Sequence, residues 1–339
     1  MFYLYQLQKC QRLETFESFK RELYPQNDEA FAEIALRLFR FQAKHCAVYR
    51  EYLQFREVNA DSVTGIEQIP FLPIQLFKTH SIRTGNWKEE QVFHSSGTTG
   101  QSLSSHAIPS LAFYEKHSQK IFEDTFGPLK GFHVLCLLPS YLERTGSSLV
   151  AMAAHFIRES GSDSSGFFLN DLDGLSRTLE SLHDGRKVLL LGVSFALLDL
   201  AERYDLNLSH CMVMETGGMK GRRKELIREE LHQVLRENLH AKTIYSEYGM
   251  TELLSQAYSA GQGIFACPPS LRVHIREIND LDTPEIKGTG RINIIDLANF
   301  HSCAFIETQD LGRIAQSGHF EVIGRMDNSD IRGCNLLIA

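Results

Sequence analysis

A run of small and hydroxylated residues is the part of this sequence best suited to binding an anion. Residues 93–100 read Phe-His-Ser-Ser-Gly-Thr-Thr-Gly, and the candidate ligands in them are Ser95, Ser96, Gly97, Thr98, Thr99 and Gly100. Glycine lets backbone N–H groups turn toward a ligand, and the hydroxyls add further donors, so this segment can surround a polyphosphate. It is not a Walker A loop, because Gly100 is followed by Gln101 and not by Lys. The alternative is a solvent-exposed loop of turn-forming residues.

A second cluster, residues 245–252, follows an apolar strand and ends in a hydroxyl and a carboxylate. An aromatic ring such as that of Tyr248 can lie against a purine, and Glu252 can hold a divalent cation that bridges phosphate oxygens. The alternative is a polar turn in which Thr251 or Ser246 caps a helix.

Two further clusters near the end of the sequence combine strand signals with charged turns. Residues 307–313 contain Asp310, and residues 324–327, which read Gly-Arg-Met-Asp, contain Arg325. An Asp at a strand end can accept hydrogen bonds from both hydroxyls of a ribose, and a nearby Arg can complete that grip or neutralise a phosphate. Such turns are also common connections between strands, so neither cluster is decisive alone.

The elements that must position these clusters follow from the hydrophobic pattern. Residues 14–23 and 29–52 have apolar residues three and four apart, which predicts helices, and the two prolines of 69–78 predict an extended connection. From residue 91 onward short apolar runs alternate with amphipathic segments, as in a layered α/β domain. We predict strands at 133–138, 187–191, 211–215, 242–245, 263–266, 291–295, 304–308 and 319–323, and helices at 109–122, 147–160, 172–183, 195–204 and 222–239. The expected organisation is a helical region, 1–90, packed on an α/β core, 91–339, with a β-rich end.

Charge, cysteine spacing and the lengths of apolar runs exclude several partners and locations for this protein. The 339 residues carry a formal net charge of -7 without a clustered basic surface, which argues against a nucleic-acid partner. The seven cysteines are dispersed and lack zinc-binding spacing, which fits a reducing compartment. We see neither a secretory signal nor an apolar run long enough to cross a bilayer. We therefore expect a cytoplasmic protein with no membrane span.

The order and spacing of the four clusters resemble those of the adenylate-forming superfamily of acyl ligases, over roughly residues 65–339. Members share a Ser/Thr/Gly phosphate loop, a Tyr-Gly-x-Thr-Glu segment, a Thr-x-Asp strand end and a Gly-Arg-x-Asp turn. The resemblance implies that residues 95–100 hold the β- and γ-phosphates of ATP. It further implies the following roles: Tyr248 against adenine, beside Gly249; Thr251 and Glu252 at the α-phosphate and magnesium; Asp310 at the ribose hydroxyls; and Arg325 in support.

Within the superfamily, the sequence is most similar to the acyl-protein synthetase component of bacterial bioluminescence-type fatty acid reductase, and next to phenylacetate-CoA ligases. Residues 70–78 with their Phe-Lys ending, the Gly-Gly turn within 215–221 and the compact length carry this similarity. It implies the large N-terminal-type α/β domain of these enzymes, with Gly217 and Gly218 lining the adenine pocket. It also implies that the mobile C-terminal lid with its catalytic lysine is absent or vestigial, which leaves Lys78, Lys220 or Arg325 as the candidate catalytic cation.

The same resemblance assigns a role to a cysteine. In bioluminescence-type synthetases a cysteine near the C-terminus accepts the acyl group as a thioester, and Cys334 lies where it can do so. The alternative is a small apolar residue beside a buried strand, and Cys303 and Cys267 are lesser candidates. The implied activity is ATP- and Mg2+-dependent activation of a carboxylic acid, such as a fatty acid, followed by transfer to Cys334, to coenzyme A or to a partner reductase.

Two other function classes stay open at this point. Residues 191–196 place Gly192 and Ser194 between a strand and a helix, as in a hydrolase nucleophile elbow, although Ala196 replaces the second glycine. A Ser-dependent acyltransferase or hydrolase would then use His133, His155 or His210 as base, whereas in an adenylating enzyme Gly192 and Ser194 would line the acyl-binding pocket. The third class is a catalytically silent nucleotide-binding homologue.

Overall fold

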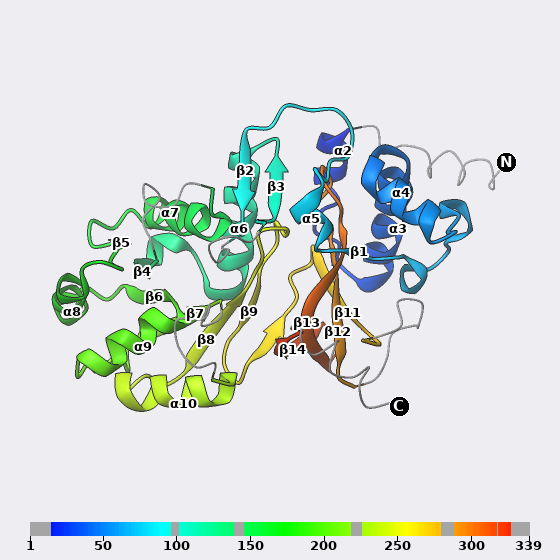
Figure 1. Cartoon of the computed structure of the whole chain (residues 1–339). Coiled ribbons are helices and arrows are strands. Elements are labelled where there is room, and N and C mark those ends of the chain that lie inside the picture. The colour runs from blue at the N-terminus through cyan, green and yellow to red at the C-terminus, as the bar shows by residue number, and fades with distance from the viewer. Residues whose placement is uncertain are drawn as a thin grey trace, which may run out of the picture.

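Two kinds of β-structure meet in one sheet at the core of the computed structural model, which describes residues 15–95, 102–138, 146–217, 226–278, 288–316 and 318–326. Twelve strands of these residues belong to the sheet, in the order β11-β12-β13-β14-β10-β9-β8-β7-β6-β4-β5, with β1 beside β13. Figure 1 shows the parallel strands between α6 and α7 on one side and α9 and α10 on the other. The predicted α/β fold class is confirmed.

The parallel half of the sheet is built from apolar strands. It comprises β4 (Phe132–Leu137), β5 (Gly166–Phe167), β6 (Lys187–Val193), β7 (Cys211–Thr216) and β8 (Ile244–Tyr248). All residues of β4 are buried, because helices cover both faces of a parallel sheet. The covering helices are α6 (Leu111–Phe126), α7 (Ser148–Ser160), α8 (Leu172–Ser181), α9 (Ser194–Arg203) and α10 (Arg228–Leu239).

The antiparallel half continues from β8 without a break. It consists of β9 (Ala257–Ser259), β10 (Ile264–Ala266), β11 (Leu271–Arg276), β12 (Gly290–Asp296), β13 (Phe305–Gln316) and β14 (His319–Arg325). A separate hairpin is formed by β2 (Gln91–His94) and β3 (Ser105–Ile108). The β-rich end predicted from the sequence is therefore part of the main sheet.

Helices from the first part of the chain cover the antiparallel half (Figure 1). They are α2 (Phe16–Lys20), α3 (Asp28–His45) and α4 (Ala47–Phe55), followed by the short turns η1 (Ala60–Ser62) and η2 (Ile66–Gln68). The rings of Phe39 and Tyr49 pack on that of Phe305 in β13, with centroids 5.8 and 6.0 Å away. The division at residue 90 stays a prediction.

Several predicted boundaries change for identifiable reasons. The single helix predicted at 29–52 is two helices, because Cys46 has an extended backbone that forms a β-bridge with Thr84. The extended connection predicted at 69–78 holds only for β1 (Leu72–Pro73), since Leu76–Thr79 forms the helix α5. The strands β2, β3, β5, β9 and β11 and the turn η3 (Leu129–Gly131) were not predicted.

A buried glutamine joins α3 to the connection between β12 and β13. The Gln42 side chain donates to the carbonyls of Asn299 and Phe300, at 2.8 and 3.1 Å, and accepts from the Ala304 N–H at 2.9 Å. Gln42 is fully buried, so these three backbone groups have no solvent to replace it.

We expect Gln42→Leu to lower the free energy of unfolding by about 3 kcal/mol, because it leaves buried backbone groups unpaired. Denaturant unfolding measures this difference. The matched control is Gln54→Leu on the exposed face of α4, which should change stability by less than about 0.5 kcal/mol. Equal effects of the two substitutions would contradict the role given to Gln42.

Candidate nucleotide site

The candidate site lies at the carboxyl ends of three neighbouring parallel strands. Strands β6, β7 and β8 end at Val193, Thr216 and Tyr248, and their parallel pairing brings these ends to one edge of the sheet. Ligands of open α/β sheets bind outside the carboxyl ends of the strands. Residues 192–194, the turn at Gly217 and the 245–252 cluster therefore lie where a ligand is expected.

The neck of the Ser/Thr/Gly segment is held by the β2–β3 hairpin. The Ser95 N–H donates to the Ser104 carbonyl at 3.0 Å, and the Ser104 N–H donates to Ser95 Oγ at 2.9 Å. Residues Ser96, Gly97, Thr98, Thr99 and Gly100 lie outside the described residues. Ser95 and Ser104 thus fix where the segment leaves and rejoins the hairpin.

Glu252 lies beside this neck. Its carboxyl group is buried, and burial raises its pKa, while a hydrogen bond from Ser104 and the charges of Arg325 and Lys78 oppose that rise. The carbonyl of Glu252 accepts from Asn299 Nδ2 at 2.7 Å. Ser104 of the neck, Lys78 of α5 and Arg325 of β14 thereby act on one carboxylate, although they are far apart in sequence.

The residue before Glu252 is anchored by a histidine of the hairpin. His106 Nδ1 lies 2.9 Å from the carbonyl oxygen of Thr251, and its Nε2 lies 2.9 Å from Ser302 Oγ. Burial lowers the pKa of His106 to about 4, so the ring is neutral and its Nδ1–H donates to the Thr251 carbonyl. The hairpin and the 251–252 segment are therefore fixed to each other.

Tyr248 and Asp310 form a second group across the site. The Tyr248 hydroxyl donates to Asp310 Oδ2 at 2.9 Å, and Asp310 lies opposite Arg325 in the β13–β14 pairing. Burial raises the pKa of Tyr248 and of Asp310, and the charge of Arg325 opposes the rise at Asp310. The Asp310 N–H donates to Thr308 Oγ1 at 3.0 Å, which fixes the backbone of the acidic residue. The structure thus brings Tyr248, Asp310 and Arg325 together.

A fully buried carboxylate holds the segment after Glu252. Asp296 Oδ2 accepts from the N–H groups of Leu254 and Ser255, both at 2.9 Å, and Oδ1 accepts from the Ser255 hydroxyl at 2.6 Å. Oδ1 also accepts from the Ala298 N–H at 3.0 Å. These bonds stabilise an ionised carboxylate, although burial raises its pKa.

The strand-to-helix turn after β6 does not have the geometry of a hydrolase nucleophile. Ser194 is 2% exposed, and its hydroxyl donates to the Gly217 carbonyl at 2.6 Å. Two proposed bases are engaged elsewhere: His133 with Ser162 and Asp184, and His155 with Gln119 and Arg158. At Gly192 a Cβ would lie 2.8 Å from Leu197, so close packing accounts for this glycine. A substrate contact by Gly192 or Ser194 stays a prediction.

Sequence reasoning missed Glu247, the residue before Tyr248. Its carboxyl group accepts a hydrogen bond from Thr216 Oγ1, and it lies over Gly249, where a Cβ would come within 2.4 Å of Glu247 Oε1. Burial and the nearby Glu215 raise its pKa to about 7, against a bond from Thr216 that lowers it. The available signal was a charged residue, Glu247, in a buried strand. The close approach of Glu247 to Gly249 explains why a glycine follows Tyr248.

Other predicted residues fall where the structure gives no description. Gly218, Lys220 and Cys334 lie outside the described residues. Cys267 and Cys303, the lesser candidates, are described: burial raises the pKa of Cys267 to about 12 and that of Cys303 well above its usual value. Neither thiol is poised to become a nucleophile.

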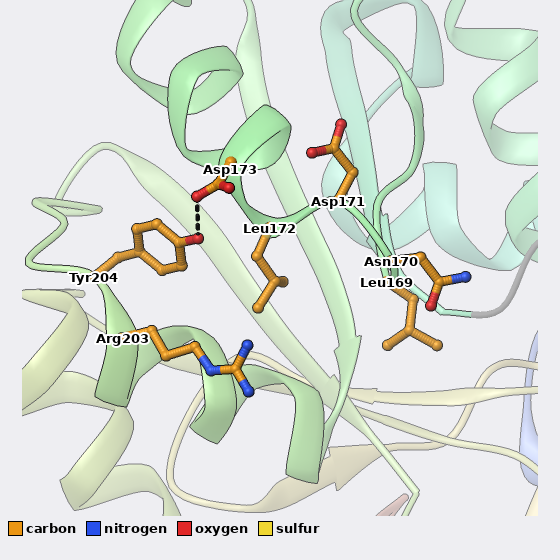
Figure 2. A pocket seen from close by; sticks show the side chains of 7 residues that line it. All are labelled: Leu169, Asn170, Asp171, Leu172, Asp173, Arg203 and Tyr204. Carbon is orange, nitrogen blue, oxygen red and sulfur yellow. Dashed lines mark hydrogen bonds between the residues drawn. The ribbon is translucent and has the colours of Figure 1, made fainter.

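The described residues carry neither a metal-binding cluster nor a helix that could span a membrane. They contain no group of three or more His, Cys, Asp or Glu side chains arranged to hold a metal ion. None of their helices is long and apolar enough to span a bilayer. A surface pocket of about 370 Å³ lies between the β5–α8 connection and the end of α9, and Figure 2 shows the Tyr204 hydroxyl directed at Asp173 there. None of the predicted site residues lines this pocket, so it is separate from the candidate site.

Glu247 makes stability depend on pH. Its pKa is raised from 4.5 to about 7, so its contribution to stability is complete below pH 4.5 and is lost as the pH rises through 7. We expect Glu247→Gln to gain stability relative to the natural protein between pH 4.5 and 8, by about 3 kcal/mol. Denaturant unfolding across this range measures the difference, with the exposed Glu230→Gln as control. A difference that does not change with pH would contradict the neutral carboxyl group.

Comparison with known proteins finds a family match in the first part of the chain. Residues 18–109 match the family model described as acyl-protein synthetase, LuxE. A stretch of 78 residues, 23% of this chain, is 38% identical to the long-chain-fatty-acid–luciferin-component ligase of Photorhabdus luminescens. The match covers 66% of that relative, slightly less than two thirds of its length.

Solved structures extend the comparison to the remaining chain. A 2-hydroxyisobutyryl-CoA ligase in the postadenylation state aligns with a TM-score of 0.63 and 12% identity, covering 94% of this chain and 73% of that one. ATP-bound MatB from Rhodopseudomonas palustris aligns with a TM-score of 0.53 and 17% identity, covering 69% and 47%. At these identities the alignments show the fold alone. Residues 18–109 therefore match the LuxE acyl-protein synthetase family, and the chain has the fold of the adenylate-forming ligases.

Proposed function

We propose that this protein activates a carboxylic acid with ATP to give an acyl-adenylate and pyrophosphate, and that a thiol then takes the acyl group from AMP. The observation that carries the proposal is the paired Tyr248 and Asp310, which face Arg325 and lie across the strand ends from Glu252 and the neck of the phosphate loop. This arrangement provides separate places for a nucleoside and for phosphates. The family match and the ATP-bound structural neighbour support the same interpretation.

In the first step the substrate carboxylate attacks the α-phosphorus of ATP and pyrophosphate leaves. Asp310 accepts hydrogen bonds from the ribose hydroxyls, and Tyr248 lies against the adenine with Gly249 and the Gly217–Gly218 turn. Thr251 serves the α-phosphate, and residues 95–100 hold the β- and γ-phosphates. Catalysis of this kind relies on positioning and on neutralising charge at the phosphates. Lys78 and Arg325, whose charges act on Glu252, are the described cations available for that role, and Lys220 is a further candidate.

Magnesium fits Glu252, with a limited set of protein ligands. Mg2+ commonly takes one or two carboxylates and completes its octahedron with phosphate oxygens and water, so a single buried carboxylate beside the loop neck is sufficient. The ion would supply charge neutralisation at the phosphates. Glu252 binds and orients it, and Ser104 and the Asn299 bond to the Glu252 carbonyl keep that carboxylate in place.

The second step needs a thiolate that the described part of the chain does not supply. Burial raises the pKa of each described cysteine, namely Cys46, Cys136, Cys211, Cys267 and Cys303. By the resemblance to bioluminescence-type synthetases, we assign the acyl group to Cys334 as a thioester, with coenzyme A or a cysteine of a partner reductase as the other acceptors. The thiolate attacks the acyl carbon, the C–S bond forms, and AMP leaves with the electron pair of the broken C–O bond.

The acid is proposed to be a fatty acid, because the similar ligase of Photorhabdus luminescens is named for long-chain fatty acids. Gly192 and Ser194 are proposed to lie beside its acyl chain. A reductase that consumes the activated acyl group is the proposed partner, and the cytoplasm the proposed location.

Asp310→Asn tests the nucleoside part of this function. Asn keeps the shape and still accepts from Tyr248, but it loses the charge that holds the ribose hydroxyls. We expect kcat/KM for ATP, followed by pyrophosphate release, to fall about 10- to 100-fold, and the preference for ATP over 2′-deoxy-ATP to fall toward one.

The control for this substitution is Asp184→Asn, which removes a carboxylate that pairs with His133 near the opposite, amino-terminal end of β6. It should leave both values unchanged. An unaltered ATP preference in Asp310→Asn would reject the ribose assignment. Natural protein that releases no pyrophosphate with any acid of a broad panel would instead identify a silent nucleotide-binding homologue.

Cys334→Ala tests the acceptor. We expect pyrophosphate release to continue and covalent labelling of the protein by radioactive fatty acid to disappear, because adenylation does not need the thiol. Intact-protein mass spectrometry gives the same answer and the mass of the acyl chain. Cys267→Ala, which removes a buried thiol with a raised pKa, should still be labelled. Labelling that persists in Cys334→Ala would exclude this residue as the acceptor.

A further inference from the structure

A carboxylate that the mechanism does not use lies directly under the strand ends of the site. Glu215, in β7, is 3% exposed and precedes Thr216 and Gly217. Its Oε1 atom lies 3.3 Å from Arg228 Nε and 3.4 Å from His232 Nε2, both on α10. Although burial opposes ionisation, these partners and Ser246 lower the pKa of Glu215, so it is a carboxylate at neutral pH.

One carboxylate oxygen of Glu215 is connected to the Gly217 turn through Ser194. Glu215 Oε2 lies 3.5 Å from Ser194 Oγ, and the same hydroxyl donates to the Gly217 carbonyl at 2.6 Å. Gly217 has a φ of 68°, a conformation that leaves its peptide groups without regular strand partners. The Ser194 hydroxyl therefore fixes the orientation of this turn, and Glu215 confines the hydroxyl.

The other carboxylate oxygen of Glu215 is connected, through Arg228, to β14, the strand that carries Arg325. Arg228 Nη1 donates to the Val322 carbonyl of β14 at 2.8 Å, and the guanidinium lies over the Phe265 ring at 5.0 Å. Val322 pairs with Gly312 of β13, two residues after Asp310. A Cβ at Gly263 would lie 3.0 Å from Arg228 Cδ, so the arginine stem is closely confined.

We propose that Glu215 is a positioning residue for the nucleotide, because one carboxylate holds the Gly217 turn through Ser194 and the β13–β14 hairpin through Arg228. This inference rests on the proposed function, in which the Gly217 turn lies at the adenine and Asp310 binds the ribose. It gives Ser194 a role different from contact with the acyl chain. Glu215 touches neither substrate and acts through the two backbone segments.

A role in stability alone would not require a buried ion pair such as that of Glu215 with Arg228. Buried ion pairs add little to stability compared with apolar residues of the same volume, whereas they do fix the relative orientation of the groups they join. Glu215 is connected through Ser194 and Arg228 to backbone carbonyls of Gly217 and Val322, in the segments proposed to hold the adenine and the ribose, where a displacement of about 1 Å changes binding.

The test is Glu215→Gln, which keeps volume and loses charge. We expect KM for ATP to rise about 5- to 30-fold, with KM for the acid and kcat at saturating ATP within about threefold of the natural protein. Direct titration with ATP should show the same loss of affinity. Loss of stability alone would lower the active fraction and would not move KM for ATP selectively.

The matched control is Glu115→Gln. Glu115 of α6 likewise holds an arginine and a histidine, Arg158 at 3.1 Å and His155 at 3.6 Å, but it joins α6 to α7 away from the Gly217 turn. It should leave KM for ATP unchanged. An equal ATP effect in both variants, or none in Glu215→Gln, would overturn the proposal.

Ser194→Ala and Arg228→Lys test the two connections separately, and keep the proposal open to refutation if Glu215→Gln does not fold. Each should raise KM for ATP by a larger factor than KM for the acid, and combining either with Glu215→Gln should give less than the sum of the single effects. Full additivity, or an equal rise of both KM values, would overturn the coupling. Natural protein that shows no saturable ATP binding would reject the proposed function itself, and this inference with it.

Discussion

The carboxylate of Asp296 holds the two halves of the sheet together at the point where the site lies. It stands at the end of β12 in the antiparallel half, and it accepts N–H groups of Leu254 and Ser255, which follow β8 of the parallel half. Backbone N–H groups cannot be satisfied by an apolar side chain, so packing alone could not give this connection its direction. Because Glu252 lies two residues before Leu254, its position depends on Asp296.

A chain of polar side chains extends this connection to the N-terminal helices. Ser255 Oγ lies 2.8 Å from His117 Nε2, and His117 Nδ1 lies 2.7 Å from the Tyr24 hydroxyl. Burial lowers the pKa of His117 to about 3, so the ring stays neutral and has one donor and one acceptor nitrogen. Neutral groups of this kind can be buried without a counter-ion, and together they fix α6 against the site.

The sequence predicts the parallel half well and the polar interior poorly. Runs such as residues 188–191 are apolar throughout, which is the expected composition of a strand covered on both faces, and β6 is found there. Strands β2 and β3, with sequences Gln-Val-Phe-His and Ser-His-Ala-Ile, have too few apolar residues for a period to be recognised. The structure brings together Tyr248, Glu252, Asp310 and Arg325, which come from three of the four clusters, while their roles stay predictions. The contacts of Ser194 and Glu247 depend on tertiary packing, which motif spacing does not contain.

The carboxylates at the strand ends explain how a site for a polyanion can also be acidic. Glu215 has Arg228, Asp310 has Arg325, and Glu252 has Arg325 and Lys78, so each of these three lies near a cation that favours its charged form. Glu247 has no such cation among the described residues and lies near Glu215, and burial raises its pKa to about 7, so that it holds a proton below that pH. Ionising Glu247 as well would place two unscreened negative charges side by side in a buried region. The site therefore limits its own negative charge by pairing or protonation, and Lys78 and Arg325 supply the positive charge near Glu252 and Asp310.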